Sequence, residues 1–390
     1  MKNVYYNRNI ENVILEASQY FSVISVTGPR QSGKSTLLKH LFPDCRYYSM
    51  KDLDMREFAE SDPRAFLNQH DGRTLFIDEV QMVPQLLGYI QGIVDEDSER
   101  RILLSGSSNF EILKGLSESL AGRVGVFELL PMNLAESHYA PEVSMDDILF
   151  NGFYPSVCSG KNKSRFFYPS YVKTYLERDV RGLLNVQNQM LFVKFMKLCA
   201  ARVGAMFNAS EVANEVGVDS KTIKKWLSVL QASYLVTLLQ PYYGNISKRL
   251  VKTPKLYFND TGLACYLLEI ESAKQLSRDK MRGALFENYV VMEVLKHRYN
   301  KGMDGGAFFY RDSNQNEVDI LLKEEGEITA IEVKSAETYH KSFEKTLRQI
   351  DSWIKEPVRR KVVVYAGDFE NTAGEVEVLN YRHLLMPSLT

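Results

Sequence analysis

The first third of the chain alternates short apolar, β-branched runs with stretches whose apolar residues recur at helical spacing. Short apolar runs of this kind predict strands, and they occur at residues 22–28, 45–50, 74–80, 101–107 and 124–130. Strands that alternate with helices favour a parallel sheet that helices cover on both faces. We therefore predict an α/β domain over this part of the chain.

The pattern changes after Pro131. Residues 165–184 and 190–204 have apolar residues at helical spacing, and residues 208–268 fit a helix-turn-helix followed by a β-wing. We expect Ser210 to begin the N-cap of the first helix of this module, and Asp219 or Ser220 to cap the second. The buried stripe of the second helix should comprise Ile223, Trp226, Leu227 and Leu230. From Met281 onward, a helix precedes three strand-like runs and another helix.

Composition and charge limit the number of domains and the kinds of partner that we expect. The chain of 390 residues is too long for one ordinary core, so two to three domains are expected. Its 48 Lys+Arg against 49 Asp+Glu give a net charge of −1, so any binding of nucleic acid must rely on local patches. No apolar signal segment or bilayer-length apolar run is present, so we expect a cytoplasmic protein with no membrane partner. Neither zinc nor disulfides are expected, because no CxxC pair occurs among Cys45, Cys158, Cys199 and Cys265.

A phosphate-binding motif follows the first predicted strand. "GPRQSGKS" fits the pattern GxxxxGK[ST], with an apolar run before it and a helical pattern after it. The glycines let successive backbone N–H groups face phosphate oxygens, and the helix adds its positive end. Lys34 is expected to reach the β- and γ-phosphates of ATP, and the Ser35 hydroxyl to ligate Mg²⁺. The predicted cofactor-binding residues are Gly28, Pro29, Arg30, Gln31, Ser32, Gly33, Lys34, Ser35 and Thr36.

Two carboxylates end the third predicted strand. In "TLFIDEVQ", Asp78 and Glu79 emerge at the carboxyl edge of the sheet, where ligands of parallel sheets bind. Asp78 is expected to hold Mg²⁺, and Glu79 to orient and polarise the attacking water. A Glu directly after the magnesium Asp is typical of the P-loop class whose catalytic acid lies on this strand. In that class an additional strand lies between the P-loop strand and the acidic strand.

Three further positions are candidates for contact with phosphate. "RILLSGSSN" ends its strand in hydroxyls and an amide, and Ser107 is the first choice for contact with the γ-phosphate or the water, ahead of Ser108 and Asn109. Arg123, just before the last strand, is a candidate arginine finger for a neighbouring subunit, which implies a homo-oligomer. A surface Arg near a helix end is the alternative. Arg178 fits either a phosphate-sensing lid residue or an exposed ion pair.

Basic residues in the helix-turn-helix module leave two interpretations open. One group lies on the outer face of the second helix and the other on the wing: Lys221, Lys224 and Lys225, then Lys248, Arg249 and Lys252. Such a face neutralises the phosphates of duplex DNA in some proteins. Winged helices also serve as lids or as protein-docking modules, with lysines that are simply solvated.

The C-terminal strands carry a second set of charged residues. Glu332 and Lys334 lie two apart on one strand and therefore share a face, and Asp319 on a hairpin partner can join them. With Glu287 on the preceding helix, the carboxylates would hold Mg²⁺ and the Lys would activate hydroxide, as in a nuclease. Cross-strand Asp–Lys pairs that need no metal are the alternative.

In order along the chain, these motifs resemble those of bacterial and archaeal AAA-type ATPases that have a C-terminal domain of unknown function. The resemblance rests on "GPRQSGKST", "LFIDEVQ", "LAGRV", "GFYPSV", "TYLERDV", "KTPKLYFNDTGLA", "GALFENYV", "NEVDILL" and "AIEVKSA". It implies an AAA-like P-loop core at 1–135, a helical lid or linker at 136–190, a winged helix at 191–268 and a PD-(D/E)xK nuclease-like domain at 269–390. Glu287, Asp319, Glu332 and Lys334 match that nuclease pattern, although Val318 replaces its proline.

The sequence thus predicts a magnesium-dependent P-loop ATPase, and three functional classes remain open. The first is an ATPase that couples hydrolysis to movement of the winged helix and tail, acting on DNA. The second is a slow signalling switch that works through protein contacts. The third is a nuclease gated by ATP.

Overall fold

A computed structural model describes residues 5–69, 74–97, 99–107, 120–176, 189–243 and 253–384. The chain divides into two compact units. The first unit comprises residues 1–132, 230–235 and 298–303, and the second comprises 133–229, 236–297 and 304–390. No helix within the described ranges is long and apolar enough to span a membrane.

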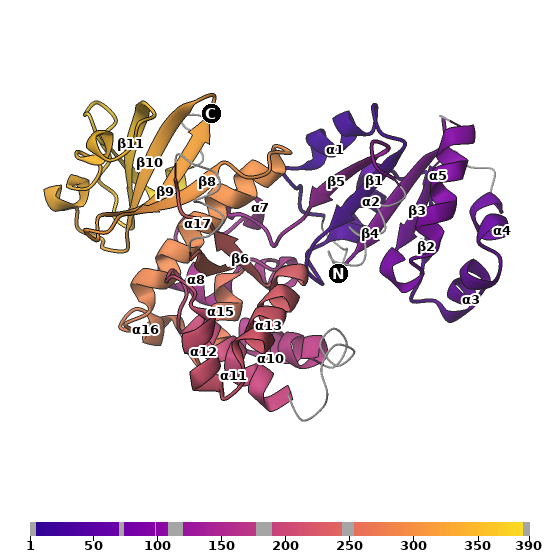
Figure 1. The fold of residues 1–390 in the computed structure, drawn as a ribbon, viewed down its shortest axis with the longest axis horizontal. Helices are drawn as coiled ribbons and strands as arrows, with labels where there is room; N and C mark the ends of the chain where they lie inside the picture. The colour runs from indigo at the N-terminus through magenta and orange to yellow at the C-terminus, as the bar shows by residue number, and fades with distance from the viewer. Residues whose placement is uncertain are drawn as a thin grey trace. The chain divides into compact units, whose positions relative to one another are not determined.

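The first unit contains a five-stranded parallel sheet in the order β2-β3-β4-β1-β5 (Figure 1). Each strand coincides with one of the apolar runs of the sequence, so the predicted parallel sheet is confirmed. β4 lies between β1 and β3, as expected for an additional strand between the P-loop strand and the acidic strand. The strands are β1 (Val23–Thr27), β2 (Arg46–Ser49), β3 (Thr74–Asp78), β4 (Arg101–Gly106) and β5 (Val124–Glu128).

Helices cover both faces of this sheet because its strands are apolar on both sides. Along β1, Ile24 and Val26 belong to one core cluster, which includes Leu37 of α2, whereas Val23 belongs to another, which includes Phe66 of α4 and Ile90 of α5. The helices of the unit are α1 (Glu11–Ala17), α2 (Lys34–Leu41), α3 (Leu53–Ser61), α4 (Pro63–Asn68) and α5 (Leu86–Glu96), with a 3₁₀ turn η1 (Val80–Met82).

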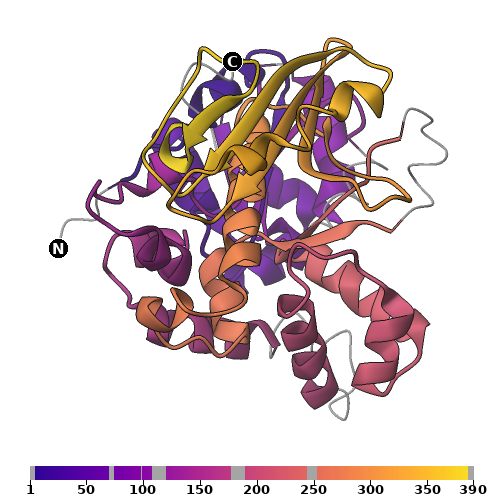
Figure 2. The same ribbon diagram turned by 90° about the vertical axis from the view of Figure 1, so that its left-hand side faces the viewer.

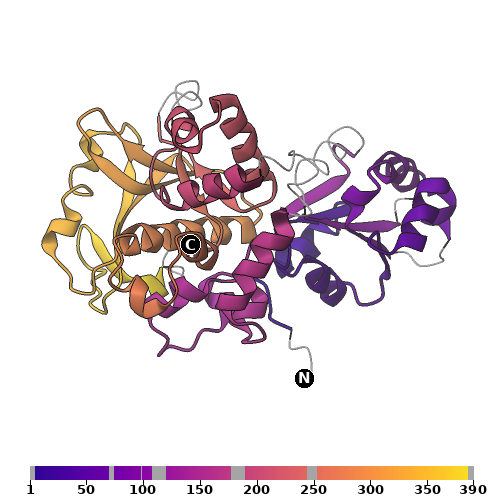
Figure 3. The ribbon, with the colours of Figure 1, turned by 90° about the horizontal axis from the view of Figure 1, so that it is seen from below.

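The second unit begins with a set of helices. In chain order they are α7 (Leu134–Ser137), α8 (Met145–Asn151), α9 (Pro155–Cys158), α10 (Ser164–Tyr175), α11 (Gln189–Ala200), α12 (Ala209–Val216) and α13 (Ser220–Ala232), the last of which extends into the first unit. Figure 3 shows the magenta to rose helices of this unit from below. Trp226 of α13 packs against Phe192 and Phe195 of α11, with ring centroids 5.4 and 5.6 Å apart. The predicted stripe of Ile223, Trp226, Leu227 and Leu230 is buried.

The predicted helix-turn-helix has one correction, at its first cap. Asn208, not Ser210, is the N-cap of α12, because its side chain accepts the amide hydrogens of Ser210 and Glu211. Asp219 caps α13 by accepting the Thr222 amide at 2.9 Å. An antiparallel pair follows, β6 (Val236–Leu239) with β7 (Lys255–Phe258). These are elements that a winged helix requires, and that assignment stays a prediction.

A second five-stranded sheet, in the order β12-β11-β10-β9-β8, lies near the C-terminus. It pairs β8 with β9 and β9 with β10 antiparallel, and β10 with β11 and β11 with β12 parallel. The strands are β8 (Ala307–Arg311), β9 (Glu317–Glu324), β10 (Glu327–Lys334), β11 (Val358–Tyr365) and β12 (Glu377–Asn380), preceded by helices α15 (Thr261–Leu267), α16 (Ala273–Leu276) and α17 (Arg282–Asn300).

The prediction for this region needs a correction as well. The sheet has two more strands than the three predicted, and the final helix is replaced by the short 3₁₀ turns η4 (Lys341–Glu344) and η5 (Ile350–Ser352), with η6 (Tyr381–His383) after β12. Leu347, between the turns η4 and η5, and Ile350 of η5 are both buried in the core of this sheet. Figure 2 shows the yellow strands beside the orange helix α17. The ring of Phe286 in α17 lies 5.8 Å from the ring of Tyr381, measured between centroids.

Candidate nucleotide site

The loop between β1 and α2 has the backbone that a phosphate site requires. Gly28 has φ 150° and Gly33 has φ 102°, conformations that side chains with a Cβ rarely adopt. A Cβ at Gly28 would lie 2.2 Å from the Leu129 carbonyl oxygen, so no larger residue fits. Gly33 is the N-cap of α2, and the loop therefore leads directly into a helix N-terminus.

Lys34 lies inside this loop. Its Nζ donates hydrogen bonds to the carbonyl oxygens of Gly28 at 2.9 Å and of Pro29 at 2.8 Å. Burial lowers the pKa of Lys34 to about 8, although the Glu79 and Asp78 carboxylates oppose that shift. Burial disfavours the charged form of Lys34 when no anion is bound. Phosphate oxygens beside Nζ would favour the ammonium form, so Lys34 is suited to binding an anion.

Asp78, the last residue of β3, accepts hydrogen bonds from three hydroxyls. Ser35 Oγ lies 2.8 Å and Tyr47 Oη 3.0 Å from Asp78 Oδ2, and Ser105 Oγ of β4 bonds Asp78 Oδ1. A hydroxyl beside a carboxylate provides the oxygen ligands that Mg²⁺ prefers. The residues present therefore fit a magnesium ion held by Ser35 and Asp78.

Glu79 has a left-handed backbone, with φ 58°, and its carboxylate is fixed on both sides. Lys51 Nζ lies 2.5 Å from Oε1, while Gln81 Nε2 lies 2.6 Å and Ser107 Oγ 3.5 Å from Oε2. Burial raises the pKa of Glu79, but the hydrogen bond and charge of Lys51 outweigh it and hold the pKa below its usual value. Ser107, the predicted sensor, thus lies beside the predicted catalytic acid; Ser108 and Asn109 lie outside the described residues.

Sequence reasoning missed three residues of this site: Lys51, Tyr47 and Ser105. Ser105 and Tyr47 occupy strands on either side of β3, so both can reach Asp78 only once the strand order is known. A signal was available for Ser105, because it lies two residues before Ser107 in the same predicted apolar run, 101–107, and residues two apart on a strand share a face. Lys51 follows β2, whose carboxyl end meets the same edge of the sheet, and no motif marks it.

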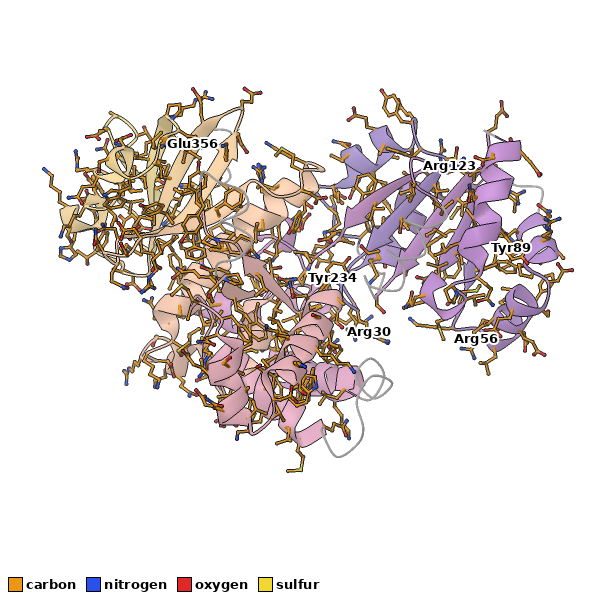
Figure 4. The ribbon with its side chains drawn as sticks, in the orientation of Figure 1. Arg30, Arg56, Tyr89, Arg123, Tyr234 and Glu356 are labelled. Carbon is orange, nitrogen blue, oxygen red and sulfur yellow. The ribbon has the colours of Figure 1, made fainter. Side chains whose placement is uncertain are left out.

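Arg123 lies at the opposite edge of the sheet. Arg123, labelled in Figure 4, directly precedes Val124 of β5, and Val124 pairs with Val23, the first residue of β1. The P-loop follows Thr27, the last residue of β1, so Arg123 and the P-loop lie at opposite ends of that strand. Its guanidinium forms a two-pronged ion pair with Asp95, at 2.5 and 2.9 Å. Arg123 therefore cannot contact a nucleotide in its own P-loop.

A comparison with known protein families agrees with the geometry of the P-loop site. Residues 20–138 match the family described as an AAA domain, and this match spans the P-loop, the acidic strand and Arg123. Residues 20–138 are therefore similar to AAA-type P-loop ATPase domains. Beyond it, residues 143–274 and 282–384 match two domains of unknown function, DUF8612 and DUF4143.

Similar proteins cover most of the chain. An uncharacterised protein of Mycobacterium tuberculosis is 28% identical over 352 residues, which is 89% of this chain and 77% of that one. An uncharacterised protein of Methanocaldococcus jannaschii is 22% identical over 377 residues, which is 87% of this chain and 81% of that one. Among solved structures, the Walker-type ATPase of Pyrococcus abyssi has a TM-score of 0.43 and 15% identity, and covers 68% of this chain and 97% of its own.

A short segment that comprises the end of α13 and the residues just after it contacts the P-loop strand of the first unit. Residues 230–235 belong to the same compact unit as that strand. The Tyr234 hydroxyl lies 2.6 Å from Thr27 Oγ1, and Thr27 directly precedes Gly28 of the P-loop (Figure 4). Tyr234 is 4% exposed and has φ 56°, a strained value for an aromatic residue. No sequence motif indicated this contact.

Among the basic residues that the sequence suggested for contact with DNA or for a phosphate-sensing lid, the structure describes only those on α13. Lys221, Lys224 and Lys225 are all exposed, on the side of α13 opposite its buried stripe. Arg178, Lys248, Arg249 and Lys252 lie outside the described residues. The structure therefore supplies one short basic helix face, which is compatible with both interpretations of the sequence.

The four predicted residues of the nuclease-like site do converge. Asp319 Oδ2 of β9 accepts the Val333 amide of β10 at 2.8 Å, and Lys334 Nζ lies 2.6 Å from Glu332 Oε1. Burial, with the nearby Glu287 and Glu332 carboxylates, raises the pKa of Asp319 well above its usual range. Burial also raises the pKa of Glu332 against the opposing charge of Lys334.

This cluster nevertheless contains an unexpected cation. Lys255 Nζ of β7 lies 2.9 Å from Glu287 Oε1, 2.6 Å from Glu317 Oε1 and 4.0 Å from Asp319 Oδ1. Within the described ranges, no group of three or more His, Cys, Asp or Glu side chains is arranged to hold a metal ion. The residues present do not fit the divalent ion that the nuclease-like pattern implies.

Proposed function

We propose that this protein binds ATP with Mg²⁺ at its P-loop and hydrolyses it. The observation that carries the proposal is the convergence of Lys34, Ser35, Asp78 and Glu79 at one edge of the parallel sheet. Bound Mg²⁺ would neutralise charge on the β- and γ-phosphates. Lys34 would bind the same oxygens, while Ser35 and Asp78 would hold the ion between them.

Glu79 is the proposed positioning base for the attacking water. Its carboxylate lies beside Ser107, so a water bonded to both would be oriented from two directions. Lys51 occupies Glu79 Oε1 in the described arrangement, and this contact must loosen before that oxygen can accept a proton. Release of Glu79 from Lys51 is thus a proposed step before hydrolysis.

Titration calorimetry with MgATP tests the proposed binding. We expect uptake of ATP by the wild type, with little uptake by Lys34→Ala and weaker uptake by wild type in EDTA. An exposed lysine of the same unit supplies the control, Lys301→Ala, which should bind as the wild type does. Equal uptake by wild type and Lys34→Ala would remove the P-loop from the account.

Arg123 is proposed to complete the site of a neighbouring subunit in a homo-oligomer. Its position at the edge of the sheet opposite the P-loop supports a role in trans, and an arginine finger accelerates hydrolysis on the order of a thousandfold. Mixing two inactive variants tests this proposal. In a mixture of Arg123→Ala and Glu79→Gln, some sites would combine an intact Glu79 with an intact neighbouring Arg123. Recovered turnover supports the finger, and an inactive mixture contradicts it.

Duplex DNA is the first proposed partner, because α13 exposes three lysines on one face. The test compares turnover with and without DNA in the wild type and in a triple Ala variant at Lys221, Lys224 and Lys225. A matched triple Ala variant at the exposed Lys341, Lys345 and Lys355 serves as the control. DNA stimulation that only the triple variant loses supports the proposal. Turnover indifferent to DNA, with assembly that changes on ATP binding, would favour a signalling switch instead.

A further inference from the structure

The Lys255 ammonium lies in the acidic cluster of the C-terminal sheet, although it belongs to a different element. β7 supplies Lys255, α17 supplies Glu287, and β9 supplies Glu317 and Asp319. The Lys255 side chain is only 2% exposed, and Nζ makes close ion pairs with Glu287 and Glu317. A buried lysine that joins three elements is not a solvated surface charge.

The acidic oxygens around Lys255 are largely occupied by protein donors. Glu287 Oε1 accepts from both Lys255 at 2.9 Å and the Tyr257 hydroxyl at 2.7 Å. Glu317 is held by Lys255 at Oε1 and by Arg311 at Oε2, at 2.6 and 3.0 Å. A divalent ion would have to displace these donors and then lie beside a buried ammonium of the same sign. Both changes oppose metal binding.

Cationic side chains of the protein already compensate most of the negative charge of the cluster. Three cationic side chains face four carboxylates, in the set Lys255, Arg311, Lys334 and Glu287, Glu317, Asp319, Glu332. Glu332 accepts from Lys334 Nζ at Oε1, whereas its Oε2 is buried and accepts no hydrogen bond from the described residues.

We propose that the Lys255 ammonium is the resident cation of this cluster and stands where a divalent ion would be required for nuclease chemistry. The nuclease-like sheet is therefore closed to metal as long as β7 keeps its place. Lys255 instead ties the β6–β7 pair to α17 and β9. This proposal is independent of the ATPase proposal, because it involves none of the residues of the P-loop site.

Manganese binding, followed by electron paramagnetic resonance without nucleotide, tests the proposal on the full chain. The wild type should bind no Mn²⁺ that depends on Asp319, so wild type and Asp319→Asn should titrate alike. Lys255→Ala should gain a Mn²⁺ site, and the double variant Lys255→Ala/Asp319→Asn should lose it again. Lys255→Arg keeps a cation in the cluster and should stay closed to Mn²⁺.

Two results would overturn the proposal. One is Mn²⁺ binding by the wild type that disappears in Asp319→Asn. The other is a folded Lys255→Ala chain that binds no more Mn²⁺ than the wild type. If Lys255→Ala does not fold, plasmid cleavage decides the matter. Metal-dependent cleavage by the wild type that Asp319→Ala abolishes contradicts the proposal, and absence of cleavage at all Mn²⁺ concentrations supports it.

Discussion

Lys51 Nζ lies 2.5 Å from Glu79 Oε1, so the proposed catalytic carboxylate is held by a lysine from the neighbouring strand end. Removing that lysine in Lys51→Met frees Oε1 and removes the charge that holds the Glu79 pKa down. We expect basal ATP turnover to rise by up to about tenfold, which corresponds to about 1.4 kcal/mol in the barrier. Steady-state turnover measures this change.

The same variant has a second readout. Because Lys51 holds the pKa of Glu79 below its usual value, Lys51→Met should move the acid limb of the pH–rate profile to higher pH. Lys301→Met, at an exposed position of the same unit, should leave the profile unchanged. Slower turnover with an unmoved acid limb in Lys51→Met would show that Lys51 supports catalysis rather than restraining Glu79.

The hydrogen bond between Tyr234 and Thr27 predicts a link between the P-loop and α13. Tyr234→Phe removes the hydroxyl and should cost about 1 kcal/mol of unfolding free energy. It should also reduce the change in hydrogen exchange that ATP causes in residues 220–235. Tyr20→Phe, at a residue that is 77% exposed, is the control. An undiminished response to ATP in Tyr234→Phe would exclude this route.

Lys34 predicts how the stability of the nucleotide-free protein depends on pH. Its pKa is about 8 when folded and 10.5 in the unfolded reference, so between these values the unfolded chain binds more protons. The free energy of unfolding should therefore rise with pH from about 8 to 10.5, by about 3 kcal/mol at most. Below that window the penalty for burying the charge is constant.

Comparison with Lys34→Met isolates this contribution. The variant carries no charge at this position, so urea unfolding at pH 7 should find it more stable than the wild type. That advantage should shrink as the pH rises above 8. A stability difference between the two proteins that does not vary from pH 7 to pH 10 would contradict the lowered pKa.

The surroundings of Gly28 predict that this position of the P-loop accepts only glycine. Gly28→Ala would bring its Cβ to 2.2 Å from the Leu129 carbonyl oxygen, so the loop or β5 must shift. We expect loss of MgATP binding by calorimetry. Gly88→Ala is the matched control, since nothing lies within 4 Å of its added Cβ and it lies in α5. That variant should bind normally and gain about 0.5–1 kcal/mol of stability.

The elements that the sequence predicted well are those encoded locally. The five strands of the AAA domain are continuous apolar runs, and the P-loop and the Asp78–Glu79 pair have fixed spacing along the chain. The place of β4 between β1 and β3 followed from the class of P-loop protein rather than from the spacing of residues, and the rest of the strand order was not predicted. The cap of α12 was misplaced by two residues because Asn208 and Ser210 are both good N-caps.

The contacts that the sequence did not reveal join segments far apart in the chain. Lys51 and Glu79 are 28 residues apart, and Tyr234 and Thr27 are 207 apart. Lys255 stands in an apolar strand, where a lysine signals a buried partner, yet its partners Glu287 and Glu317 can be named only from the folded sheet. The helix predicted after the C-terminal strand-like runs is replaced by the 3₁₀ turns η4 and η5 between β10 and β11.

ATP binding and hydrolysis by wild type and Glu79→Gln, measured on the same preparations, test the central claim most directly. Glu96→Gln, an exposed carboxylate at the end of α5, is the control for loss of a negative charge. We predict that Glu79→Gln binds MgATP as tightly as the wild type and hydrolyses it at least about a hundredfold more slowly. Equal turnover by wild type and Glu79→Gln would contradict the account.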